Sequence, residues 1–218
     1  MSATSVLMLS PGFPEDLGYF TRGLAAVGAR VYGVGDQPRQ ALPEPVQAAL
    51  VDYRQVRDLW QAEALIPEVR SFLKGRSLDR IECLWEPGVE VAAQLREAFG
   101  IPGMSVEQAI AFRDKERMKE VLDQAGVRTP RHARAATTHA VREAAEAIGY
   151  PLIIKPIAGA GAADTYRVDG ADDLDDTLRR VGHITEVSVE EFIEGEELVR
   201  EQSRLAHDYY NKLVEIER

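Results

Sequence analysis

The chain has 218 residues, which is enough for one large domain or two smaller ones with a buried core. Hydrophobic residues make up 45% and charged residues 28%, as in ordinary globular proteins. The net charge of −10 argues against duplex nucleic acid as a general partner, because an acidic surface repels a phosphate backbone.

The single cysteine, Cys83, excludes a disulfide within the chain and fits a cytoplasmic setting. It stands in the apolar segment 81–85, where a packed core thiol is favoured over a reactive nucleophile. Residues 1–10 lack a basic region and carry only a short apolar run. They therefore predict a first strand rather than a signal peptide, and we expect no membrane span.

The first hundred residues alternate between strand and helix patterns. We expect strands at 5–10, 29–34 and 80–85, helices at 15–27, 61–73 and 89–99, and a loop at 37–45. In the first helix, one face carries Leu17, Phe20, Leu24 and Val27. Residues 33–36 (Gly-Val-Gly-Asp) are interpreted as a turn. Repeated strand–helix units predict an α/β fold that begins with a Rossmann-like parallel sheet covered on both faces.

Further elements follow in the second half of the chain. We expect helices at 114–125, 138–148 and 198–218, a helix beginning at Asp172, and strands at 152–155 and 186–193. Three helices carry apolar stripes: Met118, Val121, Leu122 and Ala125; Val141, Ala144, Ala145 and Ile148; Leu174, Leu178 and Val181. The acidic run 172–176 fits a capped helix start better than a metal site. The four histidines have no ligand spacing, so we expect no histidine metal site: His132, His139, His183 and His207.

Lys155 ends a predicted strand and is followed by a loop of glycine and alanine at 157–163. A loop without bulky side chains lets backbone N–H groups approach a phosphate, and the lysine adds a point charge. Each half of this pattern is weak alone, since a strand-end lysine is usually a solvated surface residue. The pattern also lacks the Gly-Lys-Ser/Thr of a Walker loop.

Two other segments could contact a ligand. Lys115 lies in the first turn of a predicted helix, where the helix dipole disfavours a cation. The segment 189–197 (Val-Glu-Glu-Phe-Ile-Glu-Gly-Glu-Glu) could hydrogen-bond an adenine edge through its backbone and hold ribose through a carboxylate. The alternatives are a surface lysine for the first, and a strand that runs into an acidic turn for the second.

The ordered triplet of Lys115, Lys155 with its loop, and the segment 189–197 resembles ATP-grasp ligases. Similar proteins include biotin carboxylase, the large chain of carbamoyl-phosphate synthase and D-alanine–D-alanine ligase. The resemblance implies an ATP-dependent carboxylate–amine ligase that uses Mg²⁺ and acts through an acyl phosphate. It also implies a preATP-grasp domain at 1–110 and an incomplete ATP-grasp α+β lobe at 111–197. The helical spacing of apolar residues predicts a separate amphipathic helix at 198–218.

The resemblance also implies roles for individual residues. Lys115 and Lys155 would contact the ATP phosphates, and the loop over them would contain Gly159, Gly161 and Ala162. The Glu190 carbonyl and the Ile193 N–H would face adenine, with Glu191 beside them, and Glu197 would face ribose. The chain departs from many relatives at 162–164, where Ala-Ala-Asp replaces serine and a further glycine. Asp164 would repel phosphates unless it points away.

The resemblance places metal ligands on strands well after the Glu197 position, and only 21 residues follow here. We therefore expect an incomplete catalytic half, with unknown catalytic residues, no metal ligands and little turnover. The carboxylate and amine substrates are unknown. One alternative is a non-catalytic scaffold whose helix at 198–218 pairs with a partner or a second copy. Another is a dinucleotide-binding oxidoreductase, which the absent Gly-x-Gly-x-x-Gly fingerprint disfavours.

Overall fold

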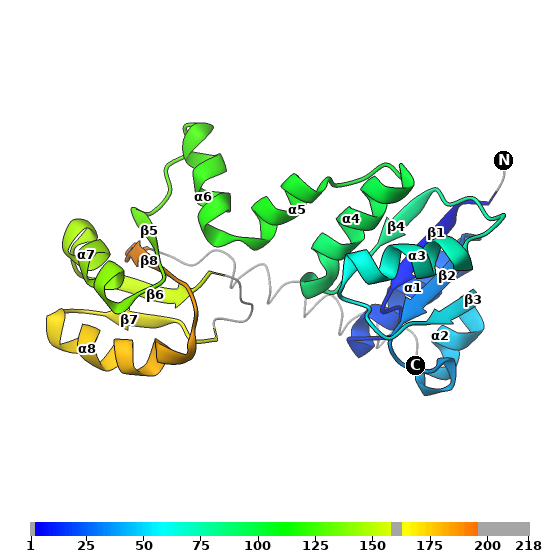
Figure 1. Cartoon of the computed structure of the whole chain (residues 1–218), viewed down its shortest axis with the longest axis horizontal. Coiled ribbons are helices and arrows are strands. Elements are labelled where there is room, and N and C mark those ends of the chain that lie inside the picture. Colours follow the sequence, from blue (N-terminus) through cyan, green and yellow to red (C-terminus); the bar gives the residue numbers. More distant parts are fainter. Residues whose placement is uncertain (1–2, 158–162, 196–218) are drawn as a thin grey trace. The chain divides into compact units, whose positions relative to one another are not determined.

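The computed structural model describes residues 3–157 and 163–195 (Figure 1). Contacts divide the chain into two compact units, Met1–Ala125 and Gly126–Arg218. Among the described residues, each unit contains one four-stranded sheet. Within the described ranges, no helix combines the length and apolar character needed to cross a bilayer.

The sheet of the first unit is parallel throughout and has the strand order β3-β2-β1-β4. Its strands are β1 (Ser5–Leu9), β2 (Arg30–Gly35), β3 (Leu50–Gln55) and β4 (Arg80–Glu82). The longer helices are α1 (Gly18–Ala26), α2 (Glu44–Ala49), α3 (Ala62–Phe72), α4 (Val89–Phe99), α5 (Val106–Arg113) and α6 (Lys115–Gln124). Three short 3-10 helices are η1 (Glu15–Leu17), η2 (Arg39–Ala41) and η3 (Glu86–Gly88).

Both faces of this sheet are buried, because successive side chains along a strand point in opposite directions. On β1, Leu7 and Leu9 pack into a core that also contains residues of α3 and α4. Val6 and Met8 pack into a second core with residues of α1 and α2. The predicted Rossmann-like layer, a parallel sheet with helices on both faces, is confirmed.

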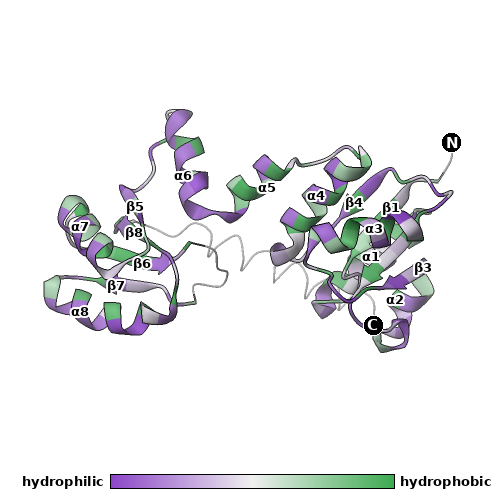
Figure 2. Ribbon diagram, viewed as in Figure 1, coloured by the Kyte–Doolittle hydropathy of each residue, from purple (hydrophilic) through white to green (hydrophobic). Residues whose placement is uncertain are grey.

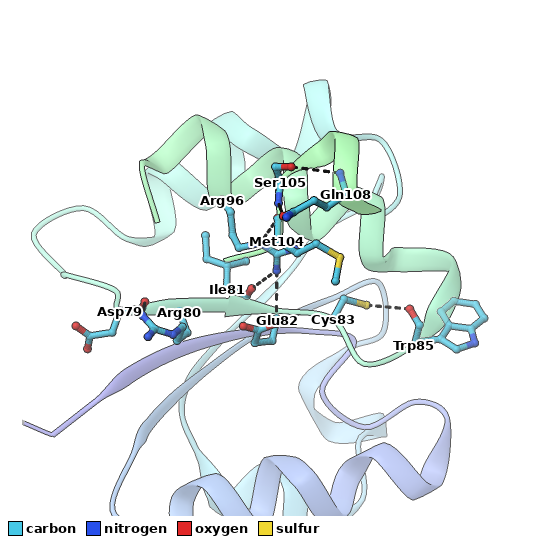
Figure 3. Close-up of polar contacts among 10 residues, drawn as sticks. All are labelled: Asp79, Arg80, Ile81, Glu82, Cys83, Trp85, Arg96, Met104, Ser105 and Gln108. Carbon is cyan, nitrogen blue, oxygen red and sulfur yellow. Dashed lines mark hydrogen bonds and ion pairs between the residues drawn. The ribbon is translucent and has the colours of Figure 1, made fainter. Parts of the chain in front are cut away.

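Arg96 of α4 connects three segments beside β4, as Figure 3 shows. Its side chain is buried, and its Nη1 donates to the Ile81 carbonyl at 2.7 Å while Nε donates to the Met104 carbonyl at 3.0 Å. Gly103 makes room for it, since a Cβ there would lie 2.6 Å from Arg96 Cδ. The guanidinium therefore ties α4 to β4 and to the segment that leads into α5.

Cys83 follows β4 and is buried, so the predicted core thiol is confirmed. Burial raises the pKa of its thiol to about 11, against smaller opposing effects of the Trp85 backbone and the Arg96 charge. Its Sγ donates a hydrogen bond to the Trp85 carbonyl at 3.4 Å. Only the thiolate reacts with a disulfide reagent, so we expect modification by DTNB near neutral pH to be about a hundredfold slower than for a free thiol. Absorbance at the reagent's product band measures this. A rate that does not rise on adding urea would contradict it.

The sheet of the second unit is antiparallel and has the order β5-β8-β6-β7. Its strands are β5 (His132–Ala135), β6 (Leu152–Pro156), β7 (Tyr166–Val168) and β8 (Val187–Glu191). The helices are α7 (Thr138–Ile148), α8 (Ala171–Arg180) and the 3-10 helix η4 (Val181–His183). The expected mixture of a parallel sheet and a separate α+β lobe is therefore present.

Helices α7 and α8 supply the core of this unit. The predicted stripe on α7 is buried, and Leu174 and Val181 are buried as well, which confirms both patterns. They pack against alternate residues of the sheet, so one face of the sheet is covered. The predicted helix 198–218 lies outside the described residues.

Two predicted stripes are largely wrong, although Leu24 of the first does pack against a core. In the first helix, a 3-10 turn precedes α1, Phe20 is 57% and Val27 83% exposed, and Thr21 is buried instead. In α6, which Figure 2 shows as largely hydrophilic, Val121 and Leu122 are exposed. The buried positions of α6 are Glu116 and Lys119, which form an ion pair with each other. Apolar spacing alone did not identify the packed face of either helix.

Several elements were not predicted from the sequence: α2, β3, α5, β5 and β7. Residues 33–35, interpreted as a turn, are the end of β2. Strand β2 continues through these residues because its glycines leave room for the Tyr53 ring of β3. A Cβ on Gly33 would lie 2.8 Å from Tyr53 Cδ2.

Candidate functional site

One face of the second sheet packs against helices α7 and α8, and the other face carries polar side chains. Along β8, Val187 and Val189 enter the core, so Ser188 and Glu190 lie on the opposite face. The register places Ser188 opposite Lys155 of β6. Lys155 therefore shares the polar face with Ser188 and Glu190, within reach of a diagonal contact.

Glu190 holds the Lys155 ammonium group. Its Oε2 lies 2.7 Å from Lys155 Nζ, and Ser188 Oγ donates to its Oε1 at 2.8 Å. Glu190 is 5% exposed and Ser188 is fully buried, whereas the Lys155 side chain is 25% exposed. A buried carboxylate with a charged partner and a hydroxyl donor fixes the position of that ammonium group. Lys155 is thus an oriented cation at the end of β6 and is not a freely solvated surface lysine.

Four predicted ligand residues lie outside the described residues: Gly159, Gly161, Ala162 and Glu197. After the loop, Asp164 accepts a hydrogen bond from Tyr166 Oη at 3.2 Å, and His183 Nε2 lies 3.6 Å from its other oxygen. Tyr166 packs against the covered core. The Asp164 carboxylate is therefore held toward the helix side of the sheet, and Lys155 lies on the other face. This is the orientation in which Asp164 does not repel a phosphate beside Lys155.

The Glu191 side chain binds the segment that precedes β5. Its Oε2 accepts from the Arg131 N–H at 3.1 Å, and the guanidinium groups of Arg131 and Arg128 lie 3.6 and 3.5 Å from its oxygens. The Arg131 N–H, followed by these two cations, holds the pKa of the Glu191 carboxyl below its usual range. The Glu191 side chain therefore connects β8 to the segment that leads into the edge strand β5.

Phe192 and Ile193 follow β8. The Phe192 N–H donates to the Pro151 carbonyl at 3.1 Å, and Arg167 Cζ lies 4.2 Å from the centre of its ring. Ile193 is exposed. The N–H and C=O groups of successive residues in a strand point to opposite neighbouring strands. The backbone groups of Glu190 therefore point toward β6, as those of Phe192 do. The adenine contacts of Glu190 and Ile193 stay predictions.

Lys115 is the first residue of α6, as predicted, after the N-cap Asp114. The Asp114 carboxylate accepts from the N–H groups of Glu116 and Arg117 at 2.9 and 3.0 Å. Lys115 belongs to the first unit and Lys155 to the second. Their convergence on one ligand stays a prediction.

A family model described as an ATP-grasp domain matches residues 112–200. The chain is similar to the L-arginine-specific L-amino acid ligase of Bacillus subtilis, with 29% identity over 132 residues, 61% of this chain and 31% of that ligase. It is also similar to D-alanine–D-alanine ligase of Xylella fastidiosa, with 35% identity over 114 residues, 50% of this chain and 38% of that ligase. It thus spans well under half the length of these curated relatives.

Among solved structures, the chain resembles an L-amino acid ligase from Bacillus licheniformis, with a TM-score of 0.67 and 22% identity. The similarity covers 89% of this chain and 45% of that ligase. At this identity the likeness describes the fold, and it includes most of both units.

Proposed function

We propose, from the premise that residues 112–200 belong to the ATP-grasp domain family, that this chain binds ATP as part of a carboxylate–amine ligase. The observation that carries the proposal is the Lys155 ammonium group, fixed by buried Glu190 at the end of β6 and directly before the Gly/Ala loop. Phosphoryl transfer depends on positioning and on neutralising the triphosphate, and a fixed cation contributes to both.

In the proposed reaction, a carboxylate oxygen takes the γ-phosphoryl group of ATP, which gives an acyl phosphate and ADP. An amine nitrogen then attacks the acyl carbon, phosphate leaves with the electrons of the C–O bond, and the nitrogen loses a proton to give an amide. The relatives named above are ligases of amino acids, so we propose substrates of that class. The scaffold alternative is not favoured by these comparisons.

The proposed ligand contacts follow the family resemblance. Lys115 and Lys155 bind the phosphates, and Gly159, Gly161 and Ala162 cover them. The Glu190 carbonyl and the Ile193 N–H face adenine, with Glu191 beside them, and Glu197 faces ribose. The proposed domain limits are 1–110 and 111–197. Residue contacts place 111–125, which contain the end of α5 and all of α6, in the first unit.

In this proposal, Mg²⁺ enters only as an ion bound to ATP. Among the residues that the structure describes, no group of three histidine, cysteine, aspartate or glutamate side chains could hold a metal ion. The described residues therefore do not fit a magnesium site, and the proposal assigns no step to one. The single buried thiol supports a cytoplasmic setting, which we also propose.

Calorimetric titration with ATP and Mg²⁺ tests the proposal. We expect saturable binding, weakened about tenfold or more by Lys155→Met, since a lost charged contact costs at least about 1.4 kcal/mol. Lys74→Met, which removes an exposed lysine after α3, is the matched control and should leave affinity unchanged. No heat at millimolar nucleotide, or unchanged affinity in the Lys155 variant, would refute the proposal. An NADH titration should give no binding.

A further inference from the structure

A pocket of about 230 Å³ opens in the first unit at the carboxyl ends of its parallel strands. The chain runs from β1 to β2 and β3 on one side, then returns to place β4 on the other side of β1. Ligands of open parallel sheets bind outside the strand ends at such a reversal of strand order. Ser10 follows β1, Asp36 follows β2, and Trp85 follows β4, and all three line the pocket. Its position is therefore that of a binding site.

Aromatic rings form one wall of the pocket. The ring centres of Trp60 and Trp85 are 5.1 Å apart, and those of Phe13 and Trp85 are 5.2 Å apart, both in edge-to-face arrangements. The backbone is shaped to hold them: a Cβ on Gly88 would lie 2.6 Å from a Trp60 ring carbon and would also overlap Cys83 Sγ. Figure 3 shows that Trp85 lies beyond the end of β4, on the far side of Cys83 from Arg96. The three rings form a packed cluster.

The opposite side carries Tyr53 and Asp36. Tyr53 Oη donates to the Gln37 carbonyl at 2.6 Å, and glycine at position 35 is needed because a Cβ would overlap that hydroxyl. Burial, assisted by the Asp36 charge, raises the pKa of Tyr53 to about 12, so the phenol is neutral at physiological pH. Among the described residues that line the pocket, Asp36 is the one carboxylate, and no lysine, arginine or histidine is present.

We propose that this pocket binds a small organic ammonium ion, with the cation against the indole rings and Asp36 as its counter-ion. Aromatic faces attract cations through their quadrupole, and a nearby carboxylate adds charge complementarity. The same carboxylate, with no basic lining residue to offset it, disfavours phosphates and carboxylates. The site uses residues of the first unit alone, so it goes beyond the proposed nucleotide site and stands or fails independently of it.

The two tryptophans of the chain, Trp60 and Trp85, both line the pocket, so intrinsic fluorescence reports on it directly. We would titrate the full chain, without nucleotide, with choline and with its neutral isostere 3,3-dimethyl-1-butanol. Choline should give a saturable change, and the neutral probe should bind about tenfold more weakly or not at all. A variant with Asp36→Asn should lose most of this preference. Asp16→Asn, an exposed change outside the pocket lining, should keep it.

Three results would overturn the proposal. The first is equal binding of both probes, which indicates an apolar pocket without charge selection. The second is a linear response to choline that matches its effect on N-acetyltryptophanamide, which indicates collisional quenching. The third is an unchanged preference in the Asp36 variant. Because Asp36 is exposed, its replacement should not prevent folding, and far-UV circular dichroism checks this.

Discussion

Replacing Lys155 with methionine is expected to destabilise the second unit by about 3 kcal/mol, because it removes a cation that lies 2.7 Å from a largely buried carboxylate. Glu190 is 5% exposed and keeps its hydrogen bond from Ser188, but it loses the ammonium group 2.7 Å away. By contrast, Arg142→Met removes an ion pair with Asp175 in which both side chains are about half exposed. That control should cost less than about 1 kcal/mol.

Urea unfolding followed by two probes measures this effect. Both tryptophans lie in the first unit, so their fluorescence follows that unit, while far-UV circular dichroism follows both. In the Lys155 variant, part of the dichroism change should move to lower urea while the fluorescence transition stays in place. A dichroism profile identical to the wild type would show that Glu190 does not depend on this partner.

The double change Lys155→Met with Glu190→Gln separates the structural role of the lysine from its proposed ligand role. A neutral amide at position 190 no longer carries the negative charge that Lys155 offsets, so most of the lost stability should return. ATP affinity should remain low, because the cation for the phosphates is still absent. Recovery of both stability and ATP affinity would mean that Lys155 serves the fold alone.

Replacing Arg96 with methionine should destabilise the first unit by about 3 kcal/mol, since hydrogen bonds from a charged donor contribute about 1.5–3 kcal/mol each. The bond to the Ile81 carbonyl is buried and the bond to the Met104 carbonyl is partly buried. The carbonyls of Ile81 and Met104 would lose their guanidinium donors, and Met cannot donate to either. Arg96→Lys should fall between, because one ammonium group replaces a fork that reaches two carbonyls.

Tryptophan fluorescence in urea measures this variant, because Trp85 follows β4, the strand that Arg96 contacts. The control is Arg80→Met on the same strand. Arg80 is exposed and donates to the carbonyl of its neighbour Asp79, so its loss should matter little. Equal midpoints for the Arg96 and Arg80 variants would contradict the role given to the buried guanidinium.

The sequence predicted the layers of the fold where the pattern of burial was strong. All five residues of β1 are buried, and the α7 stripe faces one core. In these segments the apolar residues of the sequence pattern are the residues that are buried in the fold. Strand β3 was missed because only Leu50 among its residues is buried, and β5 because it is short and partly exposed. Such edge strands carry a weak hydrophobic signal.

The errors in α1 and α6 have a different cause. Apolar residues at helical spacing mark a packed face only when a neighbouring element covers them, and the chain pattern does not state which face is covered. In α6 the ion pair of Lys119 with Glu116 allows charged residues to be buried where Val121 and Leu122 were expected.

The sequence yielded candidate ligand residues, but it did not give the arrangement of their side chains. Lys155 and Glu190 are separated by 34 intervening residues, and only the register of β6 against β8 brings their side chains together. The pocket in the first unit was missed because its signal is distributed: two tryptophans, a strand-end aspartate and glycines far apart along the chain.

The pairing on β6 also determines the distance at which Lys155 can act. Two opposite charges 2.7 Å apart cancel each other's field within a few ångströms, and physiological salt screens the remainder over about 8 Å. Lys155 is therefore a poor long-range attractor of anions and exerts its influence on contact. Under the proposed function, a triphosphate at this position would share the ammonium group with the Glu190 carboxylate, so Lys155 would affect the dissociation rate of an anion more than its association rate.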